Sequence, residues 1–505
     1  MPETSPDPLT HSSTDPLTDL LPDPLTAPLP APRPCALLLS GAQVVTVDDE
    51  RTVYTSGSVA VDGDRIVDVG PAREVEARWR PRRTVDCRGR AILPGFTDAH
   101  THLFQSFARG IGDGEPIRPW LNHFMWPYAV HLDAEDALTA VRLSAVEAAR
   151  AGITTVVDHH YAPTDPGTVL AVADAIEEIG LRGAVARGML GDRTKTADAR
   201  GLPDALYRYG TAEELELTRQ CVEARGPDAR VRVWPAPLNL SYVDRDLIGG
   251  AVALAREHGV RWHTHCSEGA GDPRSYLEAH GVRPVTWLAR EGLLDARATL
   301  AHAVWLDEEE TAAVGAAGAG VAHNPCSNAY LASGTMPWLP LREAGAVVAL
   351  GTDGPSAGGR QDVFEVMKQT LFAQRLATLD PAGVRCEDVL EAATRDGARY
   401  AGVRDAGVVR PGALADLVVV DLSGTAAQPV HRAVSALVYT ARAGDVVMTL
   451  VGGRVVYEDG HCPGIDEEAL GARARERADR LVERAGFGPL TVPWRHRSRR
   501  LGRTS

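Results

Sequence analysis

The stretch LPGFTDAHTHLFQSFARG, residues 93–110, ends an apolar run with two histidines, His100 and His102, that are one residue apart. Side chains on a β-strand alternate between its two faces, so residues two apart point the same way. Both imidazoles should therefore converge on one point at the end of a buried strand. They are either two packed or solvated histidines or half of a metal site, and the rest of the chain has to decide between these interpretations.

The composition is typical of a globular protein, with 505 residues, 44% of them apolar and 24% charged. The formal net charge is −14, and no basic cluster occurs before the extreme C-terminus, which argues against a nucleic-acid or anionic-membrane partner. No apolar run approaches the roughly 18 residues of a membrane span, and the N-terminus lacks the features of a signal peptide. The seven cysteines form no CxxC pair, so we expect neither disulfides nor a thiolate zinc site, and a cytoplasmic location.

The two ends of the chain differ in composition from its middle. Residues 1–33 repeat DPLT among many prolines and are predicted to be a disordered tail. Short β-rich runs in residues 34–92 and again in 405–465 predict one small β-sandwich domain built from both chain ends. Residues 466–505 predict a charged amphipathic helix and a basic tail, which is more typical of a solvated terminus than of an RNA contact.

Residues 93–404 alternate between strand-like and helix-like segments. Eight strands alternating with helices predict an α/β fold, a (β/α)8 TIM-like barrel. The predicted strands are Ala91–Thr97, Ile153–Asp158, Gly183–Arg187, Val231–Leu238, Val260–His265, Thr299–His302, Gly320–His323 and Val347–Thr352.

Polar residues stand at the C-terminal ends of several predicted strands. Each has a simpler explanation, because a lone histidine is often packed in a core and an aspartate in TDG is often a turn-former. Barrel enzymes place their catalytic residues at the C-terminal ends of the strands. The presence of several histidines and carboxylates at these ends therefore favours a metal site. Imidazole and carboxylate ligands suit one divalent ion, zinc being favoured and iron or manganese compatible. The residues concerned are His100, His102, His263, His265, Glu268, His302, His323 and Asp353.

The motifs PGFTDAHTHL, HTHCSE, LAHAVWLDEEE, GVAHNPCSN, LASG and ALGTDGPSA, between about residues 36 and 460, resemble the amidohydrolase superfamily and its metal-dependent aminohydrolases. The resemblance implies one metal ion held by His100, His102, His265 and Asp353. It further implies that Glu268 is the proton shuttle, that His302 contacts the hydrolytic water and that Asp353 takes part in catalysis. It assigns no role to His263, and leaves His323 as either a substrate or supporting contact or a core residue. Homo-oligomerisation is also an expectation carried by the resemblance.

Within the superfamily the chain resembles a branch that includes S-adenosylhomocysteine/methylthioadenosine deaminases, 8-oxoguanine deaminases and triazine hydrolases. Pro119 stands where the nucleoside deaminases carry a ribose-binding glutamate, and Asn239 lies near the position of their substrate-binding histidine. HTHLFQSFARG and VDHHY are similar to the 8-oxoguanine deaminases. We therefore predict hydrolytic deamination of an amino-substituted nitrogen heterocycle, a purine-like base such as guanine or 8-oxoguanine, with release of ammonia. The alternatives are deamination of an adenosine-type nucleoside and triazine-type chloro or amino hydrolysis.

Five residues are predicted to bind this heterocyclic substrate: Gln105, Arg109, Trp120, His160 and Asn328. Gln105 and Arg109 could equally lie on the surface of a first helical turn, and an aromatic residue such as Trp120 is often core packing.

Three other classes fit less well. Zinc deaminases with a PCxxC motif are excluded because NPCSNAY holds one cysteine. A non-catalytic scaffold should have lost a ligand or the HxxE glutamate, and all are present. Superfamily members that open cyclic amides usually hold two metals bridged by a carboxylated lysine, which AVARGML and APLNLS lack. One metal, and with it deamination, is favoured.

Overall fold

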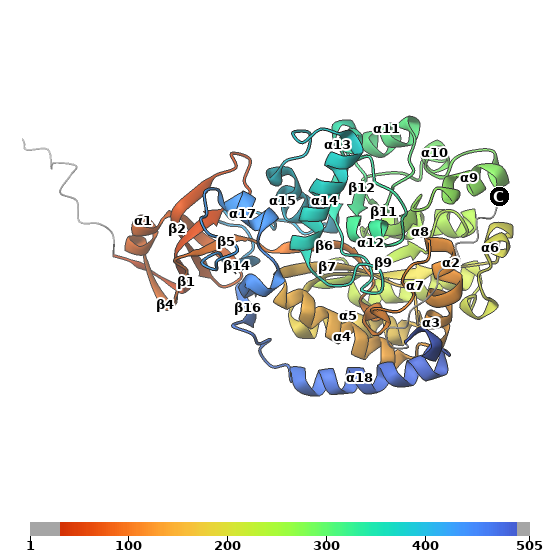
Figure 1. Ribbon diagram of the computed structural model, residues 1–505, viewed down its shortest axis with the longest axis horizontal. Coiled ribbons are helices and arrows are strands. Elements are labelled where there is room, and N and C mark those ends of the chain that lie inside the picture. Colours follow the sequence, from red (N-terminus) through yellow and green to blue (C-terminus); the bar gives the residue numbers. More distant parts are fainter. Residues whose placement is uncertain (1–30, 492–505) are drawn as a thin grey trace, which may run out of the picture.

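The computed structural model describes residues 31–491. Nearly all of the predicted disordered tail, and the basic end of the chain, lie outside the described residues. Figure 1 shows a small β-rich domain, coloured red and blue, beside a larger domain of mixed helices and strands. The small domain therefore combines segments from both ends of the chain.

The larger domain holds eight parallel strands separated by helices. Seven of the predicted strands are present with ends within two residues of the predicted ends, which confirms the α/β pattern of the sequence. The strands are β6 (Phe96–Thr101), β7 (Ile153–His160), β8 (Arg182–Met189), β9 (Val231–Pro237), β10 (Trp262–Cys266), β11 (Ala298–His302), β12 (Gly320–His323) and β13 (Val347–Leu350).

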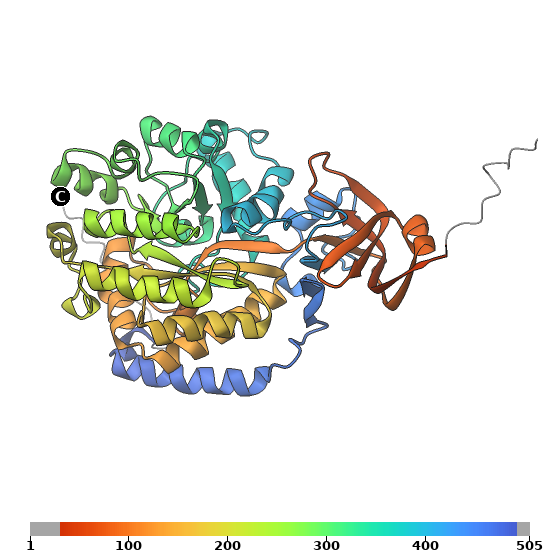
Figure 2. The ribbon, with the colours of Figure 1, turned by 180° about the vertical axis from the view of Figure 1, so that it is seen from behind.

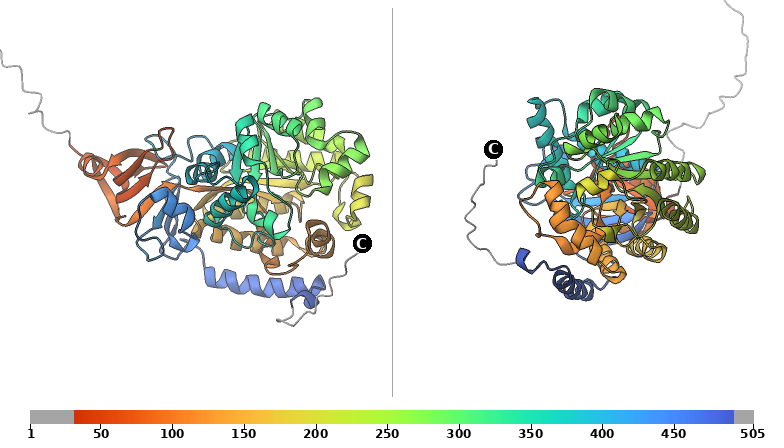
Figure 3. Two further views of the ribbon diagram at one scale, coloured as in Figure 1. Left: turned by 45° about the horizontal axis from the view of Figure 1, so that its top comes forward. Right: turned by 90° about the vertical axis from the view of Figure 1, so that its right-hand side faces the viewer.

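These strands form two parallel runs, β6-β7-β8-β9 and β10-β11-β12-β13. At one seam between the runs, Asn239, just after β9, forms a parallel bridge with His265 of β10. At the other seam, the backbone N–H of Asp353, just after β13, donates to the carbonyl of His100 in β6 over 2.9 Å. Contacts between the two strand runs at both seams are what a TIM-like barrel requires. In the right-hand view of Figure 3, helices surround the strands.

The barrel helices begin at recognisable signals. At the start of α4, for example, Asp133 accepts from the backbone N–H of Asp136, whose own side chain accepts from the backbone of Asp133, a reciprocal cap. Among residues 31–491, no helix is both long enough and apolar enough to cross a bilayer. The main barrel helices are α4 (Ala134–Arg150), α5 (Pro166–Ile179), α7 (Thr211–Arg225), α8 (Arg245–Glu257), α10 (Pro284–Arg290), α11 (Glu308–Ala316), α13 (Trp338–Ala344) and α14 (Val363–Thr378). Shorter helices are α2 (Ile117–Trp120), α3 (Trp126–His131), α6 (Lys195–Arg200), α9 (Gly271–His280), α12 (Pro325–Tyr330), α15 (Cys386–Ala393) and α16 (Arg395–Ala401).

The small domain is built on one sheet whose strand order is β16-β15-β14-β5-β1-β2-β3, with β4 also paired to β1. One cluster of buried side chains takes members from early strands, such as Leu39 and Val59, and from late strands, such as Leu417 and Leu450, so the two chain ends share a core. The elements are β1 (Arg33–Val45), β2 (Val53–Asp62), β3 (Arg65–Pro71), α1 (Ala72–Arg78), β4 (Trp79–Asp86), β5 (Arg90–Pro94), β14 (Leu417–Asp421), α17 (Ala433–Tyr439), β15 (Val446–Val451) and β16 (Arg454–Glu458).

The first predicted barrel strand, Ala91–Thr97, is wrong as a single element. The chain divides at Gly95 into β5 of the small domain and β6 of the barrel. β5 pairs antiparallel with β14, with Leu93 opposite Val418, a partner more than 300 residues away that local patterns cannot reveal. A Cβ on Gly95 would lie 2.2 Å from Thr154, so only glycine fits where the chain passes between the domains.

The charged segment after residue 465 forms a helix, α18 (Glu467–Arg484), that lies along the outside of the barrel (Figure 2). Arg477 is only 8% exposed and donates to Asp136 and Asp133 at the start of α4 over 2.5 and 2.7 Å. The predicted helix is therefore present, but it is docked on the barrel and not freely solvated.

Candidate metal centre

The histidines singled out by their positions gather at the C-terminal ends of β6, β10 and β11. The side chains of four histidines are each at most 9% exposed: His100, His102, His265 and His302. Their rings lie close together, with centroids of His100 and His102 4.7 Å apart and those of His100 and His265 5.0 Å apart. Asp353 joins them from the end of β13, with Oδ1 3.3 Å from Nε2 of His102 and 3.5 Å from Nε2 of His100.

Hydrogen bonds to backbone carbonyls fix the tautomers of two of these rings. Nδ1 of His102 donates to the carbonyl of His159, and Nδ1 of His265 donates to the carbonyl of Leu238, each over 2.7 Å. In the neutral rings, both Nε2 atoms then carry lone pairs, and these two atoms face each other at 3.2 Å. Burial lowers the pKa of His102 to about 3, so protonation does not relieve the repulsion. A cation between the two nitrogens does.

A further chain of hydrogen bonds orients His100. The hydroxyl of Thr299 donates to the carbonyl of Trp262 over 2.7 Å, so its oxygen is free to accept from Nδ1 of His263 over 3.0 Å. Nε2 of His263 is then the acceptor for Nδ1 of His100, 2.9 Å away. This leaves Nε2 of His100 as a buried lone pair with no hydrogen-bond partner among the described residues. Such outer partners are what orient metal-binding imidazoles in proteins.

The loop after β13 is strained so that Asp353 reaches the histidines. Asp353 has φ 60°, and His302 has φ 71°, both in the left-handed region that residues other than glycine seldom adopt. A Cβ on Gly354 would lie 1.8 Å from Oε1 of Gln105, so the glycine after Asp353 lets the Gln105 amide approach. Left-handed non-glycine residues commonly mark functional sites, and here two of them belong to the same cluster.

Glu268 and His302 form a second pair of groups beside Asp353. Oε2 of Glu268 lies 3.6 Å from Nε2 of His302, which is also 3.7 Å from Oδ2 of Asp353. Burial raises the pKa of Glu268 to about 7. Burial alone would lower the pKa of His302, but the negative charges of Glu268 and Asp353 outweigh it and raise that pKa. A carboxyl group with a pKa near neutrality can both accept and return a proton.

A pocket opens to solvent above this cluster. Its wall includes the aromatic side chains of Trp120, Trp126, Tyr161 and Tyr242 and a third carboxylate, that of Asp272. Asp272 is held by Arg200 across 2.6 Å. The residues at the floor of the pocket are His102, His265, Glu268, His302 and Asp353.

Of the five predicted substrate-binding residues, the structure places Gln105 and Trp120 in the pocket wall. The Gln105 amide is fixed there, because Nε2 donates to the hydroxyl of Tyr161 over 2.8 Å and Oε1 accepts from Ser356 over 2.5 Å.

The other three predicted residues lie outside the pocket. Arg109 turns toward Glu147, with which it forms an ion pair. His160 faces the opposite side of β7, where Nε2 donates to the carbonyl of Pro163 over 2.9 Å. Asn328 lies behind His302 and accepts from its Nδ1 over 3.0 Å, so it can orient that ring without touching a ligand in the pocket. His323 does not line the pocket and packs against Trp338 with ring centroids 5.7 Å apart.

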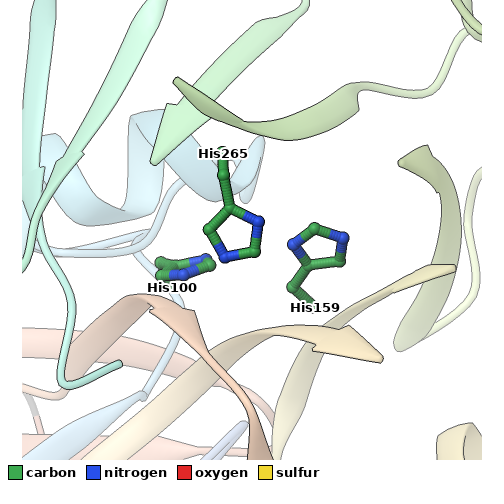
Figure 4. Close-up of side chains that lie close together, drawn as sticks. All are labelled: His100, His159 and His265. Atoms are coloured by element: carbon green, nitrogen blue, oxygen red, sulfur yellow. The ribbon is translucent and has the colours of Figure 1, made fainter. Parts of the chain in front are cut away.

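Sequence analysis gave no role to His159 and His263, which the structure places within the cluster. For His263 a signal was available, because it precedes His265 by two residues and shares its face of the strand, as His100 does with His102. For His159 the signal was the adjacent pair His159–His160, of which one member must face the barrel interior. Figure 4 shows His159 beside His100 and His265.

The residues present fit a divalent metal ion. Two sets of residues could hold an ion, and within each set the possible ligand atoms lie within 4.8 Å of one another. One set is His100, His159 and His265, and the other is His100, His302 and Asp353. Neutral imidazoles and one carboxylate are ligands that zinc accepts readily, and a cation would satisfy the buried lone pairs.

Comparisons with known proteins agree with this site. A curated 5-methylthioadenosine/S-adenosylhomocysteine deaminase of Natronomonas pharaonis is 36% identical over 450 residues, which cover 89% of this chain and 99% of the relative. The crystal structure of an adenosine deaminase from Xanthomonas campestris with bound zinc superposes with a TM-score of 0.81 at 29% identity, covering 90% of this chain and 100% of that one. An atrazine chlorohydrolase from Arthrobacter aurescens TC1, complexed with zinc, gives a TM-score of 0.79 at 25% identity, covering 88% and 100%. The sequence model of the amidohydrolase family matches residues 91–456, most of the chain, and the protein belongs to that family.

Proposed function

We propose that the protein is a metal-dependent hydrolytic deaminase that converts the amino group of a purine-like heterocycle to a carbonyl and releases ammonia. The observation that carries the proposal is the pair of opposed Nε2 lone pairs of His102 and His265, with Asp353 beside them and Glu268 over the same pocket floor. Such an arrangement suits activation of water next to a bound ring. The deaminase names of similar proteins support the same reaction.

His100, His102, His265 and Asp353 would hold the ion, which in such sites makes hydroxide available near pH 7. Glu268 is placed to accept the proton of the attacking water and to deliver it to a ring nitrogen of the heterocycle. His302, between Glu268 and Asp353, can donate a hydrogen bond from its protonated Nε2 to the oxygen that adds to the ring. The proton left on the added hydroxyl group then passes through Glu268 or Asp353 to the amino nitrogen. The carbon–nitrogen bond breaks to release ammonia as the carbon–oxygen bond becomes a carbonyl. One water is consumed for each ammonia released.

For the substrate, an adenosine-type nucleoside is the favoured form, which was the alternative in the sequence analysis. The two similar deaminases named above act on adenosine-like nucleosides by their names. The pocket also offers Asp272, a carboxylate only 6% exposed, as an acceptor for sugar hydroxyls in place of the glutamate that Pro119 removes. Glu115, in contrast, pairs with His123 over 3.1 Å and does not line the pocket.

A free purine base is the second candidate, because Gln105 is held rigidly beside the metal site by Tyr161 and Ser356. A fixed amide presents one donor and one acceptor to the edge of a small polar ring. This contact needs no sugar.

Ammonia release with methylthioadenosine, adenosine, adenine, guanine and 8-oxoguanine, measured as kcat/KM, separates these candidates. We expect the highest value for a nucleoside, and we expect Asp272→Asn to raise KM for the nucleoside much more than for the free base. Equal effects on both substrates would contradict a sugar contact at Asp272. A higher kcat/KM for guanine or 8-oxoguanine would establish the free-base alternative.

A further inference from the structure

We propose that His159 is a fourth imidazole ligand of the metal ion, in addition to His100, His102 and His265. The inference rests on the metal centre of the proposed function and extends it to a residue on β7. It makes this centre richer in nitrogen than three histidines and one aspartate.

The first observation is that the polar atoms of His159 are buried without partners. The side chain is 0% exposed, and within residues 31–491 neither ring nitrogen has a hydrogen-bond partner. A buried polar group left unpaired costs free energy, and such groups are rare unless a ligand satisfies them. His160, its neighbour, lies equally deep but donates to a carbonyl, so burial on this strand does not by itself prevent pairing.

The second observation is the position of the ring. Ring centroids of His159 lie 4.7 Å from His265, 5.5 Å from His102 and 6.0 Å from His100. The distances among those three rings are 4.7 to 5.2 Å, so His159 lies as close to His265 as these rings lie to one another and somewhat farther from the other two. In Figure 4, one ring nitrogen of His159 faces His265 and the other faces away from the cluster.

The third observation is that the nitrogens are close enough to share one ion. One ligand nitrogen each from His100, His159 and His265 lie within 4.8 Å of one another. Nitrogens bound to zinc lie about 2.0–2.1 Å from it, so two on opposite sides of one ion are about 4 Å apart. A separation of at most 4.8 Å is therefore close to that of two nitrogens that share one ion.

A hydrogen bond from His159 to one of the other histidines does not explain its position. The Nδ1 atoms of His102 and His265 already donate to carbonyls, and that of His100 donates to His263. The remaining nitrogens of these rings are acceptors, yet within residues 31–491 neither nitrogen of His159 is hydrogen-bonded to any of them. A cation satisfies all of them together.

The test is a crystal structure of the zinc-loaded protein together with zinc affinity. We expect a ring nitrogen of His159 at about 2.0–2.1 Å from the ion. A separation greater than about 3 Å, with a water or no atom between, would overturn the proposal.

In solution, His159→Phe should raise the zinc dissociation constant by at least about 100-fold, measured by competition with a chromophoric chelator. This change is at or above the 10- to 100-fold loss of metal affinity that is typical when the mutated residue only forms a hydrogen bond to a metal ligand. The matched control is His323→Phe, which replaces another buried histidine without partners among the described residues, at the end of β12 and outside the four-ring cluster. It should leave zinc affinity unchanged. The cobalt-loaded forms add a second readout, because the visible bands of cobalt follow its ligand set and should change in His159→Phe alone.

The outcomes separate the two proposals. If the wild-type protein binds no metal, the metal centre itself is wrong. If it binds metal and His159→Phe has wild-type affinity and an unchanged cobalt spectrum, only the assignment of His159 fails. If His159→Phe does not fold, the distance in the wild-type crystal structure decides.

Discussion

Two buried polar clusters lie in the barrel domain, and they differ in how far the protein satisfies them by itself. In the first, Arg187 of β8 is 0% exposed, and Glu214 of α7 lies 2.7 Å from its Nη1. Thr218 accepts from the same guanidinium over 2.7 Å, and the carbonyl of Thr164 accepts from Nε over 2.9 Å. This ion pair brings its own counter-charge, and only Nη2 of the guanidinium has no hydrogen-bond partner among the described residues.

The second cluster is the candidate metal centre, where Nε2 of His102 and Nε2 of His265 face each other at 3.2 Å. Among the described residues, Nε2 of His100 and both nitrogens of His159 have no hydrogen-bond partner. Buried polar groups are normally paired, so a cluster that remains unpaired is a site for something that binds. The comparison shows that burial and charge alone do not mark a functional site, whereas several unpartnered ring nitrogens gathered in one cluster indicate one.

The largest effect should follow loss of the metal. His102→Ala removes one of two opposed lone pairs, and we expect it to abolish stoichiometric zinc and to lower kcat/KM by at least about 10⁴-fold, because without the ion water is a poor nucleophile. Metal analysis and steady-state kinetics are the measurements, with chelator-treated wild type as the parallel sample. Full activity after complete metal removal would contradict the assignment of this cluster.

Breaking the self-satisfied cluster should instead cost stability. Arg187→Met leaves Glu214 buried without its partner, and we expect the free energy of unfolding of the zinc-loaded protein to fall by about 3–5 kcal/mol. Zinc content should stay near that of the wild type. The double variant Arg187→Met/Glu214→Leu removes both charges and should recover most of the loss in denaturant titrations. An Arg187→Met variant that is stable but lacks zinc would show that the two clusters are not independent.

Glu268→Gln should separate catalysis from metal binding within the second cluster. The amide keeps the shape but cannot carry a proton, so we expect kcat to fall by at least about 100-fold while metal content is retained. Burial raises the pKa of Glu268 to about 7, so its basic form is lost as the pH falls below 7. The wild-type kcat/KM should therefore decrease about tenfold per pH unit below that value, and the residual activity of Glu268→Gln should lack this decrease. Loss of zinc in Glu268→Gln would identify Glu268 as a ligand.

The smallest effect concerns the outer helix and the pocket wall. Phe487, just after α18, packs on Phe124 with ring centroids 5.1 Å apart, and Phe124 packs on Trp120 of the pocket at 5.8 Å. Since an aromatic pair contributes about 0.5–1.5 kcal/mol, Phe487→Ala should raise KM about two- to tenfold with little change in kcat. Leu490→Ala, at a position 42% exposed, is the control and should leave both constants unchanged. A fall in kcat with constant KM would argue against a role in shaping the pocket.

The sequence by itself determined the repeating strand–helix pattern and the residue types at the strand ends. Both are local, because strand alternation places His100 and His102 on one face, and helix and turn signals depend on near neighbours. The positions of Glu268, His302 and Asp353 after their strands were predictable for the same reason: parallel strands bring their C-terminal ends to one side of a barrel.

Only the tertiary structure decided the features that depend on distant partners. β5 separates from β6 because it pairs with β14, a strand that comes more than 300 residues later in the chain. Arg109 was predicted to face the substrate, but Glu147 draws it away from the pocket, and no local pattern encodes that ion pair. His159 and His160 have the same side chain and adjacent positions, and the direction in which β7 faces the barrel decides which one lies beside the other histidines. Periodicity tells which residues share a face, but packing against the other strands determines which face is turned inward.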